Sequence, residues 1–289
     1  MTGSGTKENP YIIENFNDLL NISGGSGTYY LLGTDIDIND TSYAAQWSTI
    51  TINCSHFDGG NHTIKNIFLN NSSTSTLKSI FKFADKQVTY FKNINLENIY
   101  INGGKSTIFS NISSYNVYFS GINLSFTSNI SFNSATDLYF IVQSGKEIFI
   151  ENSSINCLAR ASMVLGLFRG TMTNCHINAD ITYTSSNNSS SAYLFSEKML
   201  NTAVFANISS QSSITTPPSG NMSNCYFVLP TLNHISRFTT SGNIYGTCFY
   251  DKDVAPTTTA FDSNIYALST ENCKNTEYLK SIGFIVEGE

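Results

Sequence analysis

The stretch that decides the fold is Phe91-Lys92-Asn93-Ile94-Asn95-Leu96-Glu97-Asn98-Ile99-Tyr100-Ile101. Its apolar side chains alternate with polar ones, which is the two-residue period of a β-strand with one buried side. A later stretch, Ile177-Asn178-Ala179-Asp180-Ile181-Thr182-Tyr183, has the same pattern. No sustained 3.6-residue periodicity occurs between about residue 30 and residue 265, so we expect helices to be rare there.

These strands belong to an internal repeat, in which a short apolar run ending in Phe precedes a polar turn and an alternating strand. The copies begin at Ser79-Ile80-Phe81, Thr107-Ile108-Phe109, Leu138-Tyr139-Phe140, Gly166-Leu167-Phe168 and Tyr193-Leu194-Phe195. Their phenylalanines are 28, 31, 28 and 27 residues apart, and a weaker copy at Ser236-Arg237-Phe238 follows an insertion through Thr216-Pro217-Pro218-Ser219-Gly220. Repeats of this length cannot bury a face alone, so they stack into a solenoid.

Asparagine has a structural role in such a solenoid, and this chain has 34 Asn and 40 Ser. Asn tolerates the left-handed backbone conformation at tight bends, and stacked amides can hydrogen-bond along the axis. We interpret four recurring dipeptides as members of one ladder: Asn156-Cys157, Asn174-Cys175, Asn224-Cys225 and Asn272-Cys273.

Both ends of a solenoid expose apolar edges that need covering. Asn15 can cap a short helix over residues 16–22, and residues 276–283 read as a second short helix that stops at Gly283. We therefore predict an all-β chain, a single parallel β-helix of about eight to ten coils. Its N-terminal cap would cover residues 1–30, its coils residues 31–268 and its C-terminal cap residues 269–289.

The first part of the chain resembles the opening of the pectate-lyase-like right-handed parallel β-helix proteins with GLUG-type repeats. The resemblance rests on Asn9-Pro10-Tyr11-Ile12-Ile13, Asp35-Ile36-Asp37-Ile38, Trp47-Ser48-Thr49-Ile50 and Phe57-Asp58-Gly59-Gly60-Asn61-His62-Thr63-Ile64-Lys65-Asn66-Ile67. It implies a right-handed solenoid. The chain departs from the family where Lys82, Ser110 or Ser196 replace paired glycines. The opening Gly3-Ser4-Gly5-Thr6 also resembles many bacteriophage proteins of this type, while the fold itself hosts adhesins, lyases and virion parts alike.

Composition excludes several classes of protein. Charged residues make up 12% of the chain and the net charge is −6, so no basic face is available for nucleic acid. The longest apolar stretch, residues 161–168, lies between Arg160 and Arg169 and is too short for membrane insertion. The N-terminus lacks the apolar segment of a secretory signal peptide. We therefore expect folding in a cytosol, with a trimmed signal as the alternative.

The cysteines are interpreted as small buried thiols, with structural disulfides as the alternative, because a chain with a large core does not need bridges. They are Cys54, Cys157, Cys175, Cys225, Cys248 and Cys273. None has Cys-x-x-Cys spacing or a His at zinc-finger spacing, and Cys175-His176 would point to opposite faces of a strand. No metal site and no cofactor are expected.

Two pairs of acidic residues are candidates for a catalytic or metal site. Asp35 and Asp37 would share one strand face about 7 Å apart, which suits a carboxylate pair or Ca²⁺. An EF-hand loop fails there, because Asp40 and Gln46 occupy the positions of its Gly and Glu. The resemblance implies that this pair belongs to the opening module, so we interpret it as structural. Asp251 and Asp253 are interpreted as a solvated turn.

The sequence offers few other candidate catalytic residues. The histidines are His56, His62, His176 and His234, and none accompanies a nucleophile elbow. Arg160 and Arg169 are too isolated to suggest a lyase. We predict no catalytic residue, and the binding residues remain unknown. Outward tyrosines could bind a glycan by stacking, or they could fill core and interface; the candidates are Tyr90, Tyr100, Tyr115, Tyr118 and Tyr139.

The sequence therefore favours a non-enzymatic structural protein of a bacteriophage virion, on the capsid surface or associated with the tail. Its expected partners are other virion proteins and, as a second role, host surface glycans. A homotrimer is compatible with the sequence, although no trimerisation segment is visible. The alternatives are a tailspike-like polysaccharide depolymerase and a cell-surface adhesin whose signal peptide is missing from the sequence.

Overall fold

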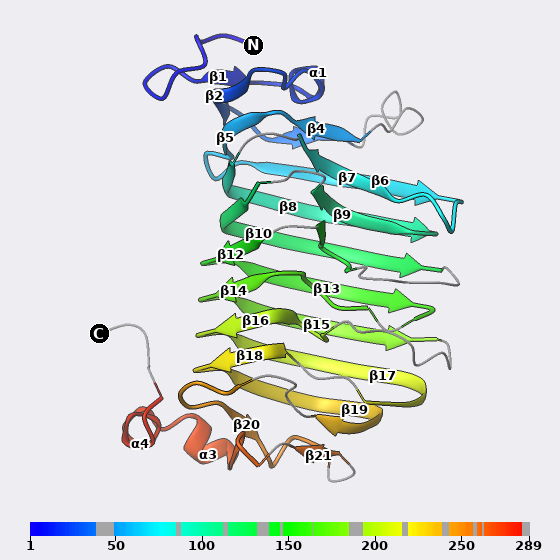
Figure 1. The fold of residues 1–289 in the computed structure, drawn as a ribbon, viewed down its shortest axis with the longest axis vertical. Coiled ribbons are helices and arrows are strands. Elements are labelled where there is room, and N and C mark those ends of the chain that lie inside the picture. The colour runs from blue at the N-terminus through cyan, green and yellow to red at the C-terminus, as the bar shows by residue number, and fades with distance from the viewer. Residues whose placement is uncertain are drawn as a thin grey trace.

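The structure is a computed structural model that describes residues 1–38, 49–84, 88–111, 115–131, 139–144, 147–163, 165–184, 193–215, 219–238, 243–256, 259–261 and 263–284. Over these residues the chain is all-β apart from three short helices. Its strands stack along the long axis from the N-terminus to the C-terminal helices (Figure 1). The long parallel sheet that results is that of a β-helix solenoid, so the predicted fold class is confirmed at this level.

One 18-stranded sheet bends into two faces, and a separate 4-stranded sheet makes a third. Face A contains β2 (Gly25–Leu32), β5 (Cys54–Asp58), the first parts of β8 (Thr89–Gly103) and β10 (Val117–Ile130), β12 (Ile148–Glu151), β14 (Thr171–Thr173), β16 (Ser196–Leu200) and β18 (Ser219–Ser223), with β1 (Tyr11–Ile13) beside β2.

Face B contains β3 (Ile36–Asp37), β6 (Thr63–Asn71), the second parts of β8 and β10, β13 (Ser154–Ala161), β15 (His176–Tyr183), β17 (Ala203–Thr215) and β19 (Tyr226–Phe238), and it is extended by β20 (Phe249–Asp251), β21 (Ala260–Phe261) and β22 (Tyr266–Leu268). Face C contains β4 (Ile50–Ile52), β7 (Lys78–Phe83), β9 (Ser106–Asn111) and β11 (Val142–Ser144). All these pairings are parallel.

The bend between faces A and B repeats one backbone conformation. Positive φ angles recur there at Asn61, Asn93, Gly121, Asn152, Asn174, Asn201, Asn224 and Gly246. Asn and Gly are the residues that adopt this left-handed region at least cost. The regular placement of Asn in the sequence is therefore what turns the chain from one face to the next.

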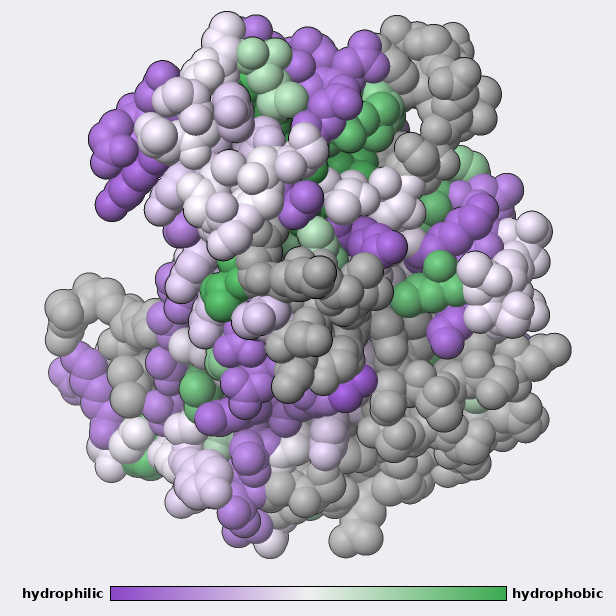
Figure 2. Space-filling view, turned by 45° about the horizontal axis from the view of Figure 1, so that its top comes forward, coloured by the Kyte–Doolittle hydropathy of each residue, from purple (hydrophilic) through white to green (hydrophobic). Residues whose placement is uncertain are grey.

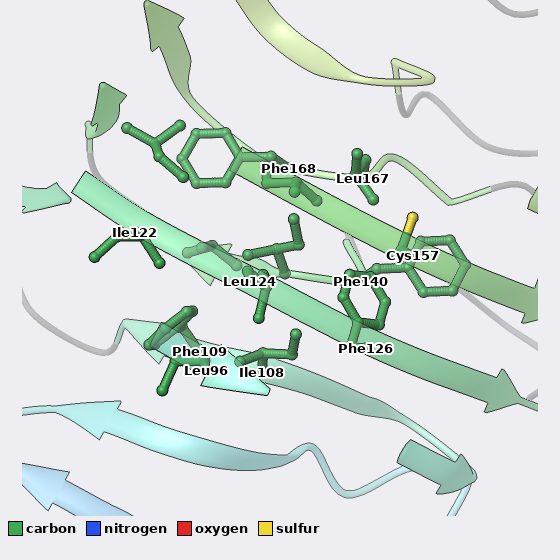
Figure 3. Packing of buried hydrophobic residues seen from close by; sticks show 14 of the residues in the cluster. Leu96, Ile108, Phe109, Ile122, Leu124, Phe126, Phe140, Cys157, Leu167 and Phe168 are labelled. Atoms are coloured by element: carbon green, nitrogen blue, oxygen red, sulfur yellow. The ribbon is translucent and has the colours of Figure 1, made fainter. Parts of the chain in front are cut away.

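The core is made of side-chain rows that run along the axis. On face A one row passes through Phe57, Phe91, Phe119, Ile150, Met172, Met199 and Met222, each in register with the next. Figure 3 shows how Leu96, Leu124 and Phe109 from different strands fill the same interior. Burial of these rows removes apolar surface that no single coil could cover.

The five repeat phenylalanines are all buried, with exposed fractions of 0 or 1%. The 28-residue step from Phe81 to Phe109 matches the register of β7 and β9, but the 31-residue step that follows does not match the register of β9 and β11. Phe109 is in register with Val142, so Phe140 lies two residues away from the row that the repeat predicts. Phe140 nevertheless packs in the interior beside Phe126, with ring centroids 6.4 Å apart.

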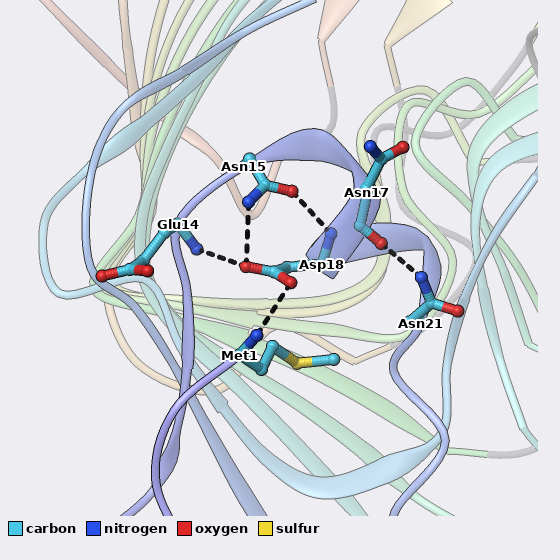
Figure 4. A network of polar contacts seen from close by, with 6 residues as sticks. All are labelled: Met1, Glu14, Asn15, Asn17, Asp18 and Asn21. Atoms are coloured by element: carbon cyan, nitrogen blue, oxygen red, sulfur yellow. Dashed lines mark hydrogen bonds and ion pairs between the residues drawn. The ribbon is translucent and has the colours of Figure 1, made fainter.

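The helices lie at the two ends of the chain. α1 (Phe16–Leu20) begins after Asn15, whose side chain accepts a hydrogen bond from the Asp18 N–H at 3.0 Å. Asp18 in turn accepts hydrogen bonds from the Glu14 N–H and the Met1 amine (Figure 4). The predicted N-cap is thus confirmed, and the helix ends two residues earlier than expected.

At the other end, α4 (Thr276–Ser281) follows the N-cap Asn275, and Gly283 has a φ of 83° just beyond it. The predicted second helix and its stop are confirmed. A further helix, α3 (Thr270–Cys273), was not expected. No helix in the described part of the chain is long and apolar enough to cross a membrane.

Some sequence predictions lie outside the described residues. They concern Asp40 and Gln46 of the rejected calcium loop, Trp47 and Ser48 of the opening module, Leu138 of the third repeat, and residues 216–218 of the insertion. Of the sixth copy, Ser236-Arg237-Phe238, only the backbone is described. It belongs to β19 and pairs with β21.

Candidate functional site: an outer aromatic ladder and the hollow at its end

The outer surface of face A carries a ladder of five stacked rings, one from each of five successive strands. The rings belong to Tyr29, His56, Tyr90, Tyr118 and Phe149. Their centroids are 4.1, 4.9, 5.0 and 4.9 Å apart, and their planes differ by 16° or less. These distances follow from the strand spacing of about 4.8 Å, because in-register side chains on parallel strands must lie one above another.

This geometry changes the interpretation of the outward tyrosines. Each inner ring of the ladder has both of its flat sides covered by neighbouring rings, so only ring edges face solvent. A sugar that stacks on an aromatic ring needs a free flat side. The ladder therefore stabilises the solenoid, and the stacked inner rings, Tyr90 and Tyr118 included, do not form the sugar-stacking stripe that was considered from the sequence.

The remaining candidate tyrosines do not extend this ladder. Tyr100 lies on face B, where it stacks on exposed Phe68 at 5.1 Å. Tyr139 is 2% exposed, so of the two roles open to these tyrosines it fills the core and does not contact a glycan. Tyr115 is exposed and lies outside the named strands. The five tyrosines thus occupy several environments.

An open hollow of ≈ 570 Å³ lies beside the N-terminal end of the ladder. Its lining residues come from the N-terminal segment, β2, β5 and β8: Lys7, Pro10, Tyr29, Tyr30, Leu31, His56, Asp58 and Lys92. The volume falls within the range of about 300–1,000 Å³ that is common for small-ligand sites. Figure 2 shows that the described surface around this end of the molecule is mostly hydrophilic or neutral.

Asp58 and Lys92 form an ion pair in this hollow, with Nζ and Oδ2 3.0 Å apart. Asp58 also accepts hydrogen bonds from the Gly60 N–H at 3.0 Å and from the Asn93 amide at 3.1 Å. Burial opposes ionisation of Asp58, but the Gly60 N–H, Lys92 and Asn93 together lower its pKa below the ordinary value. The carboxylate is therefore ionised at neutral pH and fixed in place.

His56 is the unusual member of the ladder. Burial between Tyr29 and Tyr90 lowers the pKa of His56, and the nearby charges of Lys92 and Lys7 lower it further. Its Nδ1 is buried without a hydrogen-bond partner among the described residues. A neutral imidazole flanked by two cationic side chains is an environment that would favour the approach of an anion.

The pair Asp35 and Asp37 serves the structure, as the sequence suggested. Asp35 accepts a hydrogen bond from the Thr63 N–H at 2.9 Å and lies 3.1 Å from Nδ1 of His62. Those two contacts lower the pKa of Asp35. Asp37 accepts a hydrogen bond from the Asn66 amide at 2.7 Å and faces Lys65 at 3.5 Å. Both carboxylates join β3 to the next coil.

Asp251 and Asp253 hold the start of α3. Asp251 accepts the Thr270 hydroxyl at 2.8 and 2.9 Å, and Asp253 accepts the Thr270 N–H at 2.9 Å. Asp251 is only 3% exposed, so its interpretation as a solvated residue is wrong, whereas Asp253 is exposed. The hydroxyl of Thr270 supplies the partner that makes burial of the Asp251 carboxylate tolerable.

The remaining histidines and arginines do not converge on one site. His176 lies beside Phe205 on face B, and His234 has a φ of 59°. Arg160 belongs to β13, whereas Arg169 precedes β14 and pairs with Glu197 at 3.3 Å. In the described ranges no group of three or more His, Cys, Asp or Glu side chains is arranged to hold a metal ion.

All six cysteines are buried free thiols, as predicted. Two of them occupy the bend after the Asn ladder: the thiols of Cys175 and Cys225 point back to the carbonyls of Thr173 and Ser223 at 3.3 and 3.4 Å. Ser153 and Thr202 use their hydroxyls in the same way at 2.7 and 2.8 Å. In these four coils the position carries a small side chain that donates a hydrogen bond.

The Asn ladder exists with a different membership from the one predicted. Side-chain amides join Asn152, Asn174, Asn201 and Asn224 through hydrogen bonds of 3.2, 3.1 and 3.2 Å. Asn156 is instead an exposed residue inside β13, and Asn272 lies in α3. The prediction required a following Cys, but Ser and Thr occupy that position in two of the four members.

Sequence reasoning missed the hollow and the place of His56 in the ladder. A signal was present, because an aromatic residue directly precedes the inward residue in His56-Phe57, Tyr90-Phe91, Tyr118-Phe119 and Phe149-Ile150. Lys7 and Lys92 carried no comparable signal, since they are brought together only by the path of the N-terminal segment.

Comparison with known proteins supports the fold alone. No protein-family model matches the chain, and no curated protein matches it. A solved structure from Bacteroides ovatus, provisionally assigned as an immunoglobulin A1 protease, is similar with a TM-score of 0.50 and 17% sequence identity. The similarity covers 97% of this chain and 90% of that one. At this identity the likeness indicates a shared mostly parallel β architecture.

Proposed function

We propose that this chain is a non-enzymatic structural protein whose solenoid presents a rigid surface to other proteins. The observation that supports the proposal is that the carboxylates considered for catalysis form structural hydrogen bonds. Asp35, Asp37 and Asp251 all bond to neighbouring strands or to a helix start. The pKa of Asp35 is lowered, whereas a glycosidase acid needs a raised one.

The finer architecture belongs to the same proposal. The solenoid is right-handed, as parallel β crossovers overwhelmingly are. Eight to ten coils of roughly 28 residues account for the length of the chain. The helices α1, α3 and α4 cover the two ends and protect unpaired strand edges from association. The N-cap bonds of Asn15 and Asn275 support this role for the helices.

The setting we propose is a bacteriophage virion, where the chain would dock on other particle proteins on the capsid surface or at the tail. The resemblance of the opening segment supports this setting. Mass spectrometry of purified virions from the phage that encodes the chain would find it at stoichiometric abundance. Its absence from complete particles would overturn the setting and favour a cell-surface location.

A panel of bacterial capsular and cell-wall polysaccharides tests the non-enzymatic character. We expect no release of reducing ends or unsaturated products after prolonged incubation with the purified chain. The depolymerase alternative requires product that disappears in Asp35→Asn with Asp37→Asn and survives in the matched change Asp253→Asn at the other end of the chain. Such a result would contradict the proposal.

A further inference from the structure

The hollow beside the aromatic ladder differs in charge from the rest of this acidic protein, because more cationic than anionic side chains line it. The chain has only 15 Lys and Arg against 21 Asp and Glu, yet two lysines line this one hollow. Only one carboxylate, that of Asp58, lies among the lining residues, and Lys92 already pairs with it. Lys7 is exposed and forms no ion pair with a residue in the described ranges.

The residues that line the hollow are of two chemical kinds. Pro10, Tyr29 and Leu31 supply apolar surface, while Lys7, Lys92 and His56 supply cationic or hydrogen-bonding groups. A ligand that complements both kinds of residue has a short apolar stem and an anionic head. A glutamate or aspartate side chain presented on a protein segment has that form, and acidic segments meet basic hollows through charge complementarity.

We propose that this hollow docks an acidic segment of a partner protein, with the segment's carboxylate held between Lys7 and Lys92 beside His56. This inference rests on the proposed docking function and names the chemistry of its partner. The carboxylate would receive charge-assisted hydrogen bonds from the two ammonium groups. Its stem would lie against Pro10 and the edge of Tyr29.

His56 provides a reporter inside the hollow. Burial by its ring neighbours and the charges of Lys92 and Lys7 keep its pKa below the ordinary value. The other ionisable groups that line the hollow or stack on His56 are Tyr29, Tyr30, Asp58 and Tyr90. A bound carboxylate counteracts the lysines and raises the pKa of His56, so binding strengthens as pH falls through that pKa.

The test uses the full chain and a fluorescein-labelled hexaglutamate peptide as probe, with hexaglutamine as the uncharged counterpart. Anisotropy titrations at low salt are expected to show binding of hexaglutamate only. Lys7→Gln is expected to weaken it about tenfold, since a hydrogen bond to a charged group is lost. Lys198→Gln is the matched control: Lys198 is exposed in the same outer row of face A but remote from the hollow.

Imidazole NMR of His56 gives an independent readout. Lys7→Gln should raise the pKa of His56 in the free protein, and hexaglutamate should raise it in the unmodified protein. Equal weakening by Lys7→Gln and Lys198→Gln, or binding of hexaglutamine, overturns the proposal. Phosphate or an acidic oligosaccharide binding more tightly than the peptide overturns the protein-segment assignment. Cleavage of a polysaccharide would refute the non-enzymatic function but would not change the outcome of the peptide-binding experiment.

Discussion

Asn174 shows how a single side chain sets the bend between two faces. It has a φ of 52° and its amide is hydrogen-bonded to Asn152 and Asn201. Asn174→Ala should lower the free energy of unfolding by about 2 kcal/mol, because it loses these bonds and places in the left-handed region an Ala, which adopts that conformation less readily than Asn. Asn174→Gly should recover about half of that loss. Urea denaturation measures both.

The sequence supplies a matched control at Asn156, which also precedes a Cys but lies exposed inside β13. Asn156→Ala should change stability by no more than about 0.5 kcal/mol. If the two alanine variants were equally stable, the amide ladder would have no energetic role and the bend would be determined by the core alone.

The buried thiols make stability depend on alkaline pH. Burial raises the pKa of Cys54 and of Cys157 to about 12, whereas a thiol in the unfolded chain ionises near 8.5. The unfolded state therefore binds fewer protons between these values. The stabilisation is complete below about pH 8 and declines as pH rises, by up to about 1.4 kcal/mol per pH unit for each thiol.

Urea unfolding across this alkaline range measures the decline. Cys54→Ala lacks one of the thiols, so its stability should fall less steeply with pH than that of the unmodified chain. An identical slope in the two proteins would show that the Cys54 thiol does not contribute. Reaction with a thiol reagent should also be slow in the folded protein and complete for all six cysteines in denaturant.

At the scale of the elements, the ladder of rings on face A should stabilise the strands that carry it. Tyr90 stacks on His56 and on Tyr118. Tyr90→Ala should lower the free energy of unfolding by about 1–3 kcal/mol, since ring pairs contribute about 0.5–1.5 kcal/mol each beyond burial. Tyr90→Phe keeps the stack and should cost little.

Tyr266→Ala is the comparison for Tyr90→Ala, because Tyr266 is 54% exposed at an outer position of β22. A loss at Tyr266 as large as that at Tyr90 would mean that exposed tyrosines contribute through burial alone. Thermal unfolding of the three variants in one buffer separates the two explanations.

The elements also show what sequence can predict about this protein. Alternation fixes which side of each strand is inward, and Ile94 and Leu96 of the alternating stretch are buried as that pattern predicts. Register between coils depends on how many residues each turn uses, and the shifted position of Phe140 could not be predicted from spacing. The hollow depends on Lys7 approaching Lys92 from a distant segment, for which a local pattern contains no information.

At the scale of the molecule, each coil contacts mainly its neighbours, so stability should be close to a sum over coils and their interfaces. Because Asn178 is in register with Phe205, one coil can be removed without changing the alternation of inward and outward side chains. Deletion of residues 178–204 joins Ile177 to Phe205 and removes the 27-residue interval that also separates Asn174 from Asn201. The inward and outward positions of every later strand are preserved.

A deletion one residue shorter, of residues 178–203, joins Ile177 to Val204, and both of these side chains are inward. Because side chains alternate with a period of two, this reverses the orientation of the strand that follows. We expect the longer deletion to give a monodisperse protein with a β-sheet circular dichroism spectrum and cooperative unfolding at reduced stability. The shorter deletion should aggregate or remain unfolded. Equal behaviour of the two proteins would contradict a solenoid in which coil length alone sets the register, and would require a bulge that absorbs the extra residue.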